Sequence, residues 1–149
     1  MERLLVARVG PERIAIPAME VMEVIEASSL TLIPLAPEGL RGQCLWRDLL
    51  VPVLDPYLLT GVPRSQAAGA NAGVVLVIRR GSGAFAIWVD DVEQVLDVDP
   101  TSIREVPPGL DRAARLSKLL RTTDGLVAVL DVGVLHAAAD ATLQEGARR

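Results

Sequence analysis

Few residues of this sequence have the chemistry of a catalytic or metal site. The chain contains one histidine, His136, and one cysteine, Cys44. A nucleophile needs a base beside it, and a metal site normally needs several His, Cys or carboxylate ligands. Cys44 stands in an apolar segment, where a cysteine is most often a small core residue. We interpret His136 as structural, so the sequence predicts no catalytic residue, no metal and no cofactor.

Carboxylates are the remaining groups that could bind a cation or transfer protons. They occur next to predicted strands, where Asp is typical of turns, so we interpret them as turn residues; they are Asp90, Asp91, Asp97 and Asp99. Phosphate-binding glycine loops are also missing, because GSG at 81–83 reads as a hairpin turn. The sequence therefore predicts a protein that is not an enzyme.

The composition narrows the class of protein further. Half of the 149 residues are hydrophobic and the net charge is −4, which argues against nucleic-acid binding because such proteins usually carry a basic stripe. The aliphatic run at 74–78 is far shorter than the roughly 20 residues of a membrane-spanning helix. A single cysteine suits a reducing compartment. We expect a cytoplasmic protein.

Two segments of the chain are nearly copies of each other. LLVPVLDPYLL at 49–59 corresponds to GLVAVLDVGVL at 125–135, which places Asp55 and Asp131 in equivalent positions. Upstream, residues 8–26 align with 79–97 without a gap, and six of those 19 positions are identical. An internal duplication is the simplest explanation. Equivalent aspartates then favour a structural role, because an active site seldom needs the same residue in both copies.

Each copy contains the same series of short strands rich in β-branched residues, separated by Gly and Pro turns. The predicted strands are 3–9, 13–17, 21–27, 43–46 and 49–54, then 74–80, 84–89, 92–98, 117–121 and 126–131. This pattern predicts an all-β fold with short helices. Because a half of this size is marginal alone, we expect two pseudo-repeated five-stranded β-barrel subdomains around a shared hydrophobic core.

The domain organisation follows from the same pattern. Residues 1–138 form one domain of two interpacked halves, about 1–61 and 74–138. Residues 62–73 are rich in Ala, Gly and Ser and are expected to be an exposed, flexible linker. Residues 139–149 are expected to be a helical and polar tail.

Several segments in order resemble the CheW-like domain family. GPERIAIPAMEVMEVI is similar to the family pattern xYALPxxxVxEV, and LTLIPLAPEGLRG to LPxxPxxxxG. GQCLWRDLLVPVLDPYLLTG resembles GxxNLRGxxVPVxDLxxxLG, and VVLVIRRGSGAFAIWVDDVEQVLDVDPTSI resembles the second half with its VDxVxxVxxL. The resemblance runs from about Leu4 to Leu135 and implies a fold of two small barrels.

The resemblance also implies a function. Members of the family are non-catalytic adaptors that couple chemoreceptors to a CheA-type histidine kinase, and they bind the kinase regulatory domain and the cytoplasmic tip of the receptor. Other CheW-like proteins are further expected partners, within an array at the membrane but without insertion into it. Matching positions imply partner contacts at Val21, Glu23, Val24, Gly42, Trp46, Arg47 and Asp48.

This sequence departs from the family pattern near the expected contacts. Leu45 and Asp48 replace the Asn and Gly of Asn-Leu-Arg-Gly, Pro56 replaces a Leu, and Lys118 stands near a usual Gly. These departures imply a divergent array, for example one for surface motility. Asp48 is expected to occupy a position that favours an unusual φ. Trp46 is either an exposed interface anchor or a core residue at a barrel end.

Two other functions stay open from the sequence alone. A small-molecule sensor would need a closed cavity of several hundred Å³, for instance in the crevice between the halves. An enzyme would need His136 to cluster with two carboxylates in one cleft.

Overall fold

The structure is a computed structural model that describes residues 1–27, 31–32, 40–55, 72–105, 118–130, 133, 136–137 and 140–141. Strands dominate these residues. Their bounds are β1 Glu2–Val9, β2 Glu12–Pro17, β3 Val21–Glu26, β4 Thr31–Leu32, β5 Leu40–Trp46, β6 Leu49–Leu54, β7 Val74–Arg80, β8 Gly83–Val89, β9 Asp91–Val98, β10 Ile103–Glu105, β11 Lys118–Thr122 and β12 Gly125–Val129. Two short 3-10 helices, η1 Ala18–Glu20 and η3 Pro100–Ser102, follow β2 and β9.

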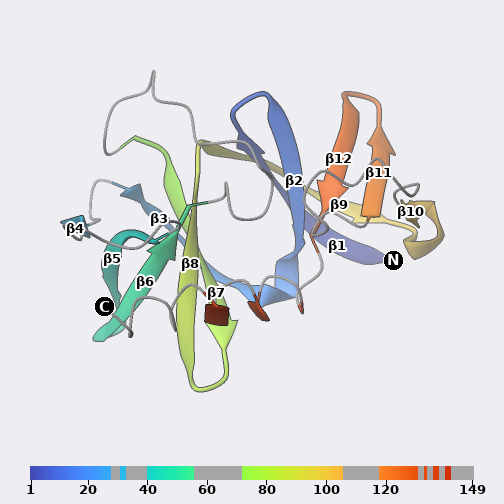
Figure 1. Cartoon of the computed structure of the whole chain (residues 1–149). Coiled ribbons are helices and arrows are strands. Elements are labelled where there is room, and N and C mark those ends of the chain that lie inside the picture. The colour runs from blue at the N-terminus through green and yellow to red at the C-terminus, as the bar shows by residue number, and fades with distance from the viewer. Residues whose placement is uncertain are drawn as a thin grey trace.

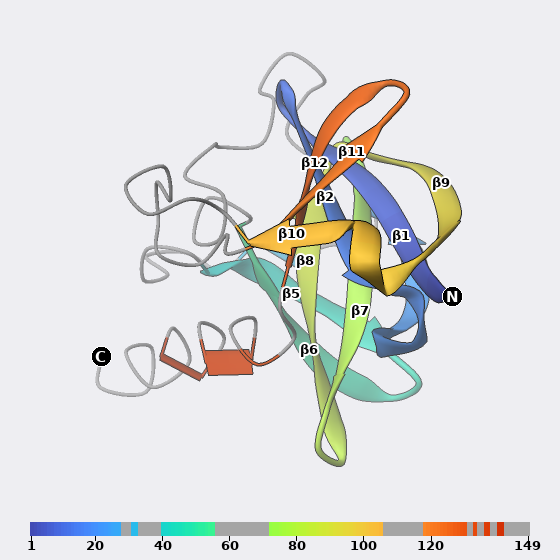
Figure 2. The same cartoon turned by 90° about the vertical axis from the view of Figure 1, so that its right-hand side faces the viewer.

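The strands form two curled sheets that stand side by side (Figures 1 and 2). Barrel 1 has the order β3-β7-β8-β6-β5-β4, and barrel 2 has the order β10-β11-β12-β2-β1-β9. The halves of the chain therefore exchange their first hairpins, because β1–β2 lies in barrel 2 and β7–β8 lies in barrel 1. Each hairpin joins its sheet through a parallel pair, β12 with β2 and β6 with β8. Neither sheet is complete without both halves.

The duplication extends to an irregularity in the pairing. Between β1 and β9, Val6 pairs with Gln94 and Ala7 with Val92, which leaves Glu93 as an extra residue. Between β3 and β7 the register shifts at the matching place and leaves Met22 as the extra residue. Bulges bend a strand and increase its twist. The same bulge in both sheets therefore gives both sheets the same curl.

Alternating side chains along the hairpin strands fill three apolar cores. In β1, Leu4 and Val6 point into barrel 2, whereas Leu5 and Ala7 point toward barrel 1. Successive residues of a strand point to opposite faces, so these strands are buried on both sides. The core between the barrels contains Leu5, Ala7, Val9, Ile14, Ile16, Leu54, Leu76, Ile78, Phe85, Ile87, Val89 and Leu130. The shared hydrophobic core predicted from the duplication is confirmed.

The predicted strands are found with small differences at their ends, and β4 and β10 are two short strands that the sequence did not predict. The end of the predicted linker differs from the expectation. Ala72 accepts a hydrogen bond from the indole of Trp88 at 2.8 Å, and Gly73 accepts one from the backbone N–H of Ala27 at 3.1 Å. These two residues are anchored to barrel 1, while 62–71 lie outside the described residues.

The C-terminal segment is described only in part. Residues 133, 136–137 and 140–141 are helical, and Asp140 accepts a 2.7 Å hydrogen bond from Nε of Arg80 on β7. Residues 142–149 of the expected tail lie outside the described part. No helix among the described residues has the length and apolarity required to cross a bilayer.

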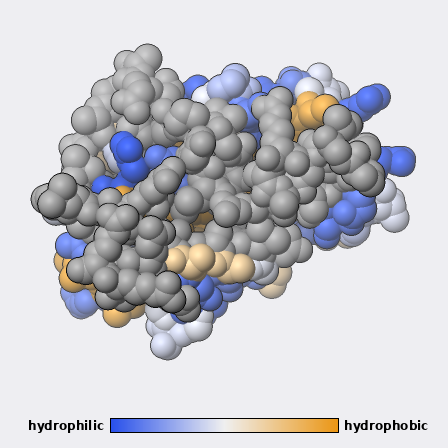
Figure 3. Space-filling view, in the orientation of Figure 1, coloured by the Kyte–Doolittle hydropathy of each residue, from blue (hydrophilic) through white to orange (hydrophobic). Residues whose placement is uncertain are grey.

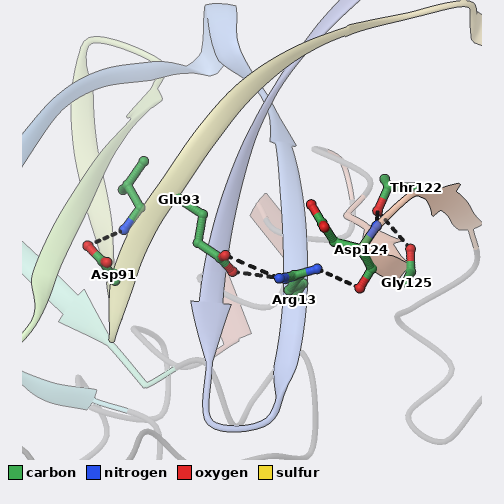
Figure 4. A network of polar contacts seen from close by, with 7 residues as sticks. Arg13, Asp91, Glu93, Thr122, Asp124 and Gly125 are labelled. Carbon is green, nitrogen blue, oxygen red and sulfur yellow. Dashed lines mark hydrogen bonds and ion pairs between the residues drawn. The ribbon is translucent and has the colours of Figure 1, made fainter.

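Barrel 2 is closed at one end by a polar network (Figure 4). Nε of Arg13 on β2 donates to a carboxylate oxygen of Glu93 on β9 at 3.0 Å. Nη1 of the same guanidinium donates to the backbone carbonyl of Asp124, in the β11–β12 turn, at 2.8 Å. In barrel 1 the equivalents of Arg13 and Glu93 are Ala84 and Met22, which pack against the apolar core. The two barrel ends are therefore chemically different.

An exposed ion pair connects the two halves where β1 meets β9, and it should titrate measurably. Nε of Arg3 lies 2.9 Å from Oδ1 of Asp97, and this hydrogen bond, with the adjacent charge, lowers the Asp97 pKa. Because this pKa is lower in the folded state, the ion pair stabilises the fold at pH values above the ordinary aspartate pKa of about 4. This stabilisation is lost as the pH falls through the lowered pKa. We expect Arg3→Ala to raise the Asp97 pKa in a carboxyl ¹³C NMR titration.

Asp99 is the internal control for that titration. Its pKa is lowered by hydrogen bonds from the backbone N–H and hydroxyl of Thr101. The Arg3→Ala substitution should leave this value unchanged. An Asp97 pKa that is equally low in the variant would show that Arg3 is not its cause.

Candidate functional site

The tip of the β5–β6 hairpin has an unusual backbone. Arg47 and Asp48 form a two-residue turn in which both φ angles are positive, 48° and 65°. This is the geometry of the tight hairpin turns that match the twist of the strands, and Asn or Gly usually occupies them. The expectation that Asp48 occupies a special φ is confirmed. Arg47 has a large side chain in a conformation that costs a non-glycine residue roughly 1–2 kcal/mol.

Trp46, just before the turn, is a core residue and not an exposed anchor. Its side chain is buried with Cys44, Val51 and Trp88 in the core of barrel 1. Its indole N–H donates to Oε2 of Glu23 on β3. Because β3 and β5 stand far apart in the order of the sheet, this bond joins opposite sides of the curled sheet. Trp46 and Glu23 therefore close barrel 1 at this end.

Arg47 lies directly on this closure. The guanidinium carbon of Arg47 is 4.9 Å from the centre of the Trp46 ring, a cation–π distance. The ring of Trp46 is held in turn by Glu23. Glu23, Trp46 and Arg47 thus form a chain of contacts, referred to below as the Arg47 clamp, that presents a cation at the surface of barrel 1.

The other predicted contact residues divide into two groups. Val24 is 44 % exposed and follows Glu23 on the edge strand β3, so it is accessible to a partner. Val21 is half-buried and packs against the core between the barrels. Gly42 is buried in β5, between its neighbours β4 and β6. The structure brings Glu23, Trp46 and Arg47 into contact, with Asp48 in the same turn. Val24 is only a chain neighbour of Glu23, and Gly42 lies apart from this surface.

Exposed leucines beside the turn were not predicted. Leu45 and Leu50 face each other across the β5–β6 pair and are 64 % and 68 % exposed, and Leu49 is 43 % exposed. Hydrophobic surface is visible on the side of the molecule where β5 and β6 lie (Figure 3). Strand alternation was the available signal, since a buried Trp46 requires an outward Leu45. Leu45 and Leu50 therefore lie on the opposite face of the hairpin from the Trp46 ring that carries Arg47, so the hairpin tip has a cation on one face and an apolar patch on the other.

The equivalent hairpin of barrel 2 lacks this surface. Thr122 and Thr123 occupy the positions of Trp46 and Arg47, and Gln94 occupies that of Glu23. The turn there achieves its geometry differently, with a positive φ of 121° at Gly125. The hydroxyl of Thr122 donates to the Gly125 carbonyl at 2.8 Å. Since the fold forms in barrel 2 without a clamp, the fold alone does not require the clamp residues of barrel 1.

The Glu23–Trp46 bond gives a stability prediction. Glu23→Ala should lower the free energy of unfolding by about 1–3 kcal/mol, because it leaves the indole N–H of a buried Trp without its acceptor. The measurement is urea denaturation followed by tryptophan fluorescence. Gln94→Ala, at the equivalent exposed position of β9, should change stability by less than about 0.5 kcal/mol. Equal effects of both substitutions would contradict the role of this bond.

The residues weighed for catalysis have structural surroundings. His136 packs its ring edge-to-face on Phe85, with centroids 5.7 Å apart. Burial raises the pKa of the Cys44 thiol, which keeps it protonated and unreactive. Oδ2 of Asp55 lies 3.7 Å from Nη1 of Arg41, while Asp131 lies outside the described residues. Over the described ranges, no three His, Cys, Asp or Glu side chains come together as metal ligands would.

Three of the four carboxylates predicted as turn residues bond to backbone at turns or strand ends, whereas the prediction is wrong for Asp97, which lies within β9 and pairs with Arg3. Oδ2 of Asp90 accepts a hydrogen bond from the backbone N–H of Gly10 at 2.6 Å, so it holds the β1–β2 turn. Oδ1 of Asp91 accepts from the N–H of Val92, and Asp99 caps η3. These contacts account for Asp90, Asp91 and Asp99 by backbone hydrogen bonding.

Comparisons with known proteins agree with this architecture. The profile of the CheW-like domain matches residues 3–139. FrzA of Myxococcus xanthus is 34 % identical over 88 residues, which cover 49 % of this chain and 55 % of FrzA; the chain thus matches about half the length of that relative. The crystal structure of the scaffolding protein TtCheW from Thermoanaerobacter tengcongensis has the same fold, with a TM-score of 0.76 at 22 % identity over 88 % of this chain and 84 % of that one.

Proposed function

The chain belongs to the CheW-like domain family, and we propose that it is a non-catalytic adaptor that couples chemoreceptors to a CheA-type histidine kinase. The observation that carries the proposal is the surface of barrel 1 around the Arg47 clamp. It combines a cation held on a buried ring with exposed leucines on the adjoining strands. Aromatic residues, Arg and apolar side chains are enriched where proteins bind each other.

Within this surface, we assign different roles to the predicted residues. Arg47, Asp48 and Val24 are exposed and contact the partner. Glu23 and Trp46 hold Arg47 in place, and Val21 supports β3 from the core between the barrels. Gly42 has a packing role, because it is buried between two strands. The leucines at 45, 49 and 50 add apolar contact area at the same hairpin tip.

The partners follow from the family: the regulatory domain of the kinase, the cytoplasmic tip of the receptor and other CheW-like chains. An adaptor of this kind works in the cytoplasm, in an array at the membrane. The departures at Leu45 and Asp48 change the surface that meets a partner, which supports a divergent array. Contacts of this type are commonly modest in area, and the array adds strength by multivalency.

Isothermal titration calorimetry of the purified chain tests the proposal. The regulatory domain of a CheA-type kinase and a soluble receptor-tip fragment, both from the same organism, are titrated separately and then together. We expect saturable binding to at least one of them. Failure to bind either fragment, with all three proteins folded by circular dichroism, would refute the adaptor function.

A small-molecule sensor is less well supported than an adaptor. Such a sensor was expected to use a cavity in the crevice between the halves. That region is filled by the apolar core between the barrels, whose buried members are at most 7 % exposed. We therefore retain the adaptor as the function that the geometry supports best.

A further inference from the structure

Barrel 2 has a hollow at one end that barrel 1 fills with its own side chain. The hollow measures about 240 Å³, and its lining includes Glu2, Pro17, Ile103, Lys118, Val129, Leu130 and Gly133. Val129 and Leu130 are buried, and they form an apolar wall. Glu2 and Lys118 are half-buried and bring one charge of each sign to the same hollow. An apolar cavity of about 150 Å³ is large enough to hold benzene, so this hollow has room for a planar ring.

The duplication identifies what occupies the equivalent place in barrel 1. Pro17, at the end of β2, corresponds to Trp88 near the end of β8, since Leu4 pairs with Pro17 as Val75 pairs with Trp88. Trp88 is fully buried in the core of barrel 1. A Pro in barrel 2 at the place of the Trp in barrel 1 leaves the volume of most of an indole empty.

Three kinds of contact hold Trp88 in barrel 1. Its ring packs in an apolar core that includes Val53, the equivalent of Val129. Its indole N–H donates to the carbonyl of Ala72 at 2.8 Å. The guanidinium carbon of Arg41 lies 5.4 Å from the ring centre, as in a cation–π contact. Walls, an acceptor and a cation together recognise an indole.

The hollow of barrel 2 has a counterpart for each of these contacts. Val129 corresponds to Val53 as a wall, and Leu130, whose equivalent Leu54 belongs to the core between the barrels, adds a second wall. Glu2 corresponds to Gly73, where an added Cβ would lie 3.2 Å from the indole nitrogen of Trp88, so its carboxylate can replace the carbonyl as acceptor. Lys118 corresponds to Gly42, the neighbour of Arg41, and supplies a cation.

We propose that this hollow is a binding site for a single aromatic side chain, a tryptophan presented by a partner protein, which enters as Trp88 does in barrel 1. The inference goes beyond the adaptor function, because it concerns barrel 2 and does not depend on the Arg47 clamp. It gives the chain a second docking point whose specificity is for a planar ring with an N–H donor.

The test uses the isolated full chain with N-acetyl-tryptophanamide as the probe and N-acetyl-leucinamide for comparison. Ring-current shifts of the methyl groups of Ile103, Val129 and Leu130 are followed by ¹H–¹³C NMR. We expect saturable shifts with a dissociation constant on the order of 1 mM for the tryptophan probe, and at least fivefold weaker binding of the leucine probe. Pro17→Trp should remove binding of the probe by filling the hollow from within.

A tryptophan added elsewhere is the matched control. Leu126→Trp, at an exposed position of barrel 2 outside the lining of the hollow, should leave the binding of the probe unchanged. If Pro17→Trp does not fold, Ile103→Phe narrows the same hollow from the half-exposed strand β10 and should weaken binding at least threefold. Three results would overturn the proposal. The first is the absence of saturable shifts at probe concentrations up to 20-fold above the expected dissociation constant. The others are equal binding of the two probes and undiminished binding of the tryptophan probe by a folded variant whose hollow is filled.

Discussion

Gly73→Ala is expected to lower the free energy of unfolding by about 3 kcal/mol or more, one of the largest effects for a single methyl group in this protein. Gly73 has a φ of +94°, which side chains of L-residues rarely adopt. A Cβ there would also lie 2.4 Å from the backbone carbonyl oxygen of Val89. Because that neighbour is backbone of the central strand β8, it cannot move aside cheaply. Guanidinium denaturation followed by tryptophan fluorescence measures the loss.

Two other glycines separate the contribution of backbone strain from that of the close contact with Val89. Gly81 also has a positive φ, +57°, but a Cβ there meets nothing within 4 Å. Gly81→Ala should therefore cost only the strain of the conformation, about 1–2 kcal/mol. Gly83 lies outside the positive-φ region, and a Cβ there would have its nearest contact at 3.7 Å. Gly83→Ala should therefore stay within about 1 kcal/mol of the parent chain. Equal stabilities of all three variants would contradict the close packing of Gly73.

The consequence of this prediction concerns the anchoring of the two halves. Gly73 accepts a hydrogen bond from Ala27, and its neighbour Ala72 accepts one from Trp88. A shift of this segment would disturb both the entry into β7 and the indole in the core of barrel 1. The point where the second half begins is therefore part of the packed structure.

Arg47→Gly is expected to weaken partner binding by about 30-fold, roughly 2 kcal/mol, while the chain becomes no less stable. The substitution removes the guanidinium that the clamp presents. It also relieves the positive φ of 48° at Arg47, which should raise the free energy of unfolding by about 1 kcal/mol, after the loss of the contact with Trp46. Calorimetry with the kinase regulatory domain and the receptor tip measures binding, and denaturation measures stability.

A charge reversal and its counterpart in the second copy complete the experiment. Arg47→Glu should weaken binding by more than Arg47→Gly, because it also brings a like charge toward Glu23 and Asp48. Thr123→Glu adds the same charge at the equivalent turn of barrel 2 and should leave binding within about twofold. If Thr123→Glu reduces binding as strongly as Arg47→Glu, the partner does not bind specifically to the surface of barrel 1.

The backbone strain at Arg47 and Asp48 is informative because the equivalent turn of barrel 2 forms without a positive φ at either position. The β11–β12 turn places a glycine, Gly125, where its backbone needs a positive φ. The equivalents of Arg47 and Asp48 in that turn, Thr123 and Asp124, have no positive φ, whereas Arg47 and Asp48 both do, at the cost of strain. Unfavourable backbone geometry persists where a side chain has a use that outweighs the strain, so an outlier of this kind is a reason to look for function. Arg47 is such a residue.

Much of the fold could be predicted from the sequence, because the pattern of apolar residues along a strand shows whether one or both of its faces are buried. Residues such as Leu4 and Leu5 or Val75 and Leu76 belong to unbroken apolar runs, which indicate strands buried on both faces. The paired segments around Asp55 and Asp131 indicated a duplication, and the turn chemistry of Asp48 indicated a positive φ. Each of these signals is local in the chain.

The tertiary structure decided what depends on residues distant in the sequence. The exchange of hairpins between the barrels rests on parallel pairs such as Val53 with Ala86 and Val129 with Ala15, and no local pattern specifies a partner strand. Trp46 read equally well as an anchor or as a core residue. Only the curl of barrel 1, which brings Glu23 of β3 onto the indole, buries Trp46 and leaves Arg47 outside. The curl of a sheet results from the twist and the bulges of many strand pairs. It is a property of the assembled sheet, so the few residues around one turn do not determine it.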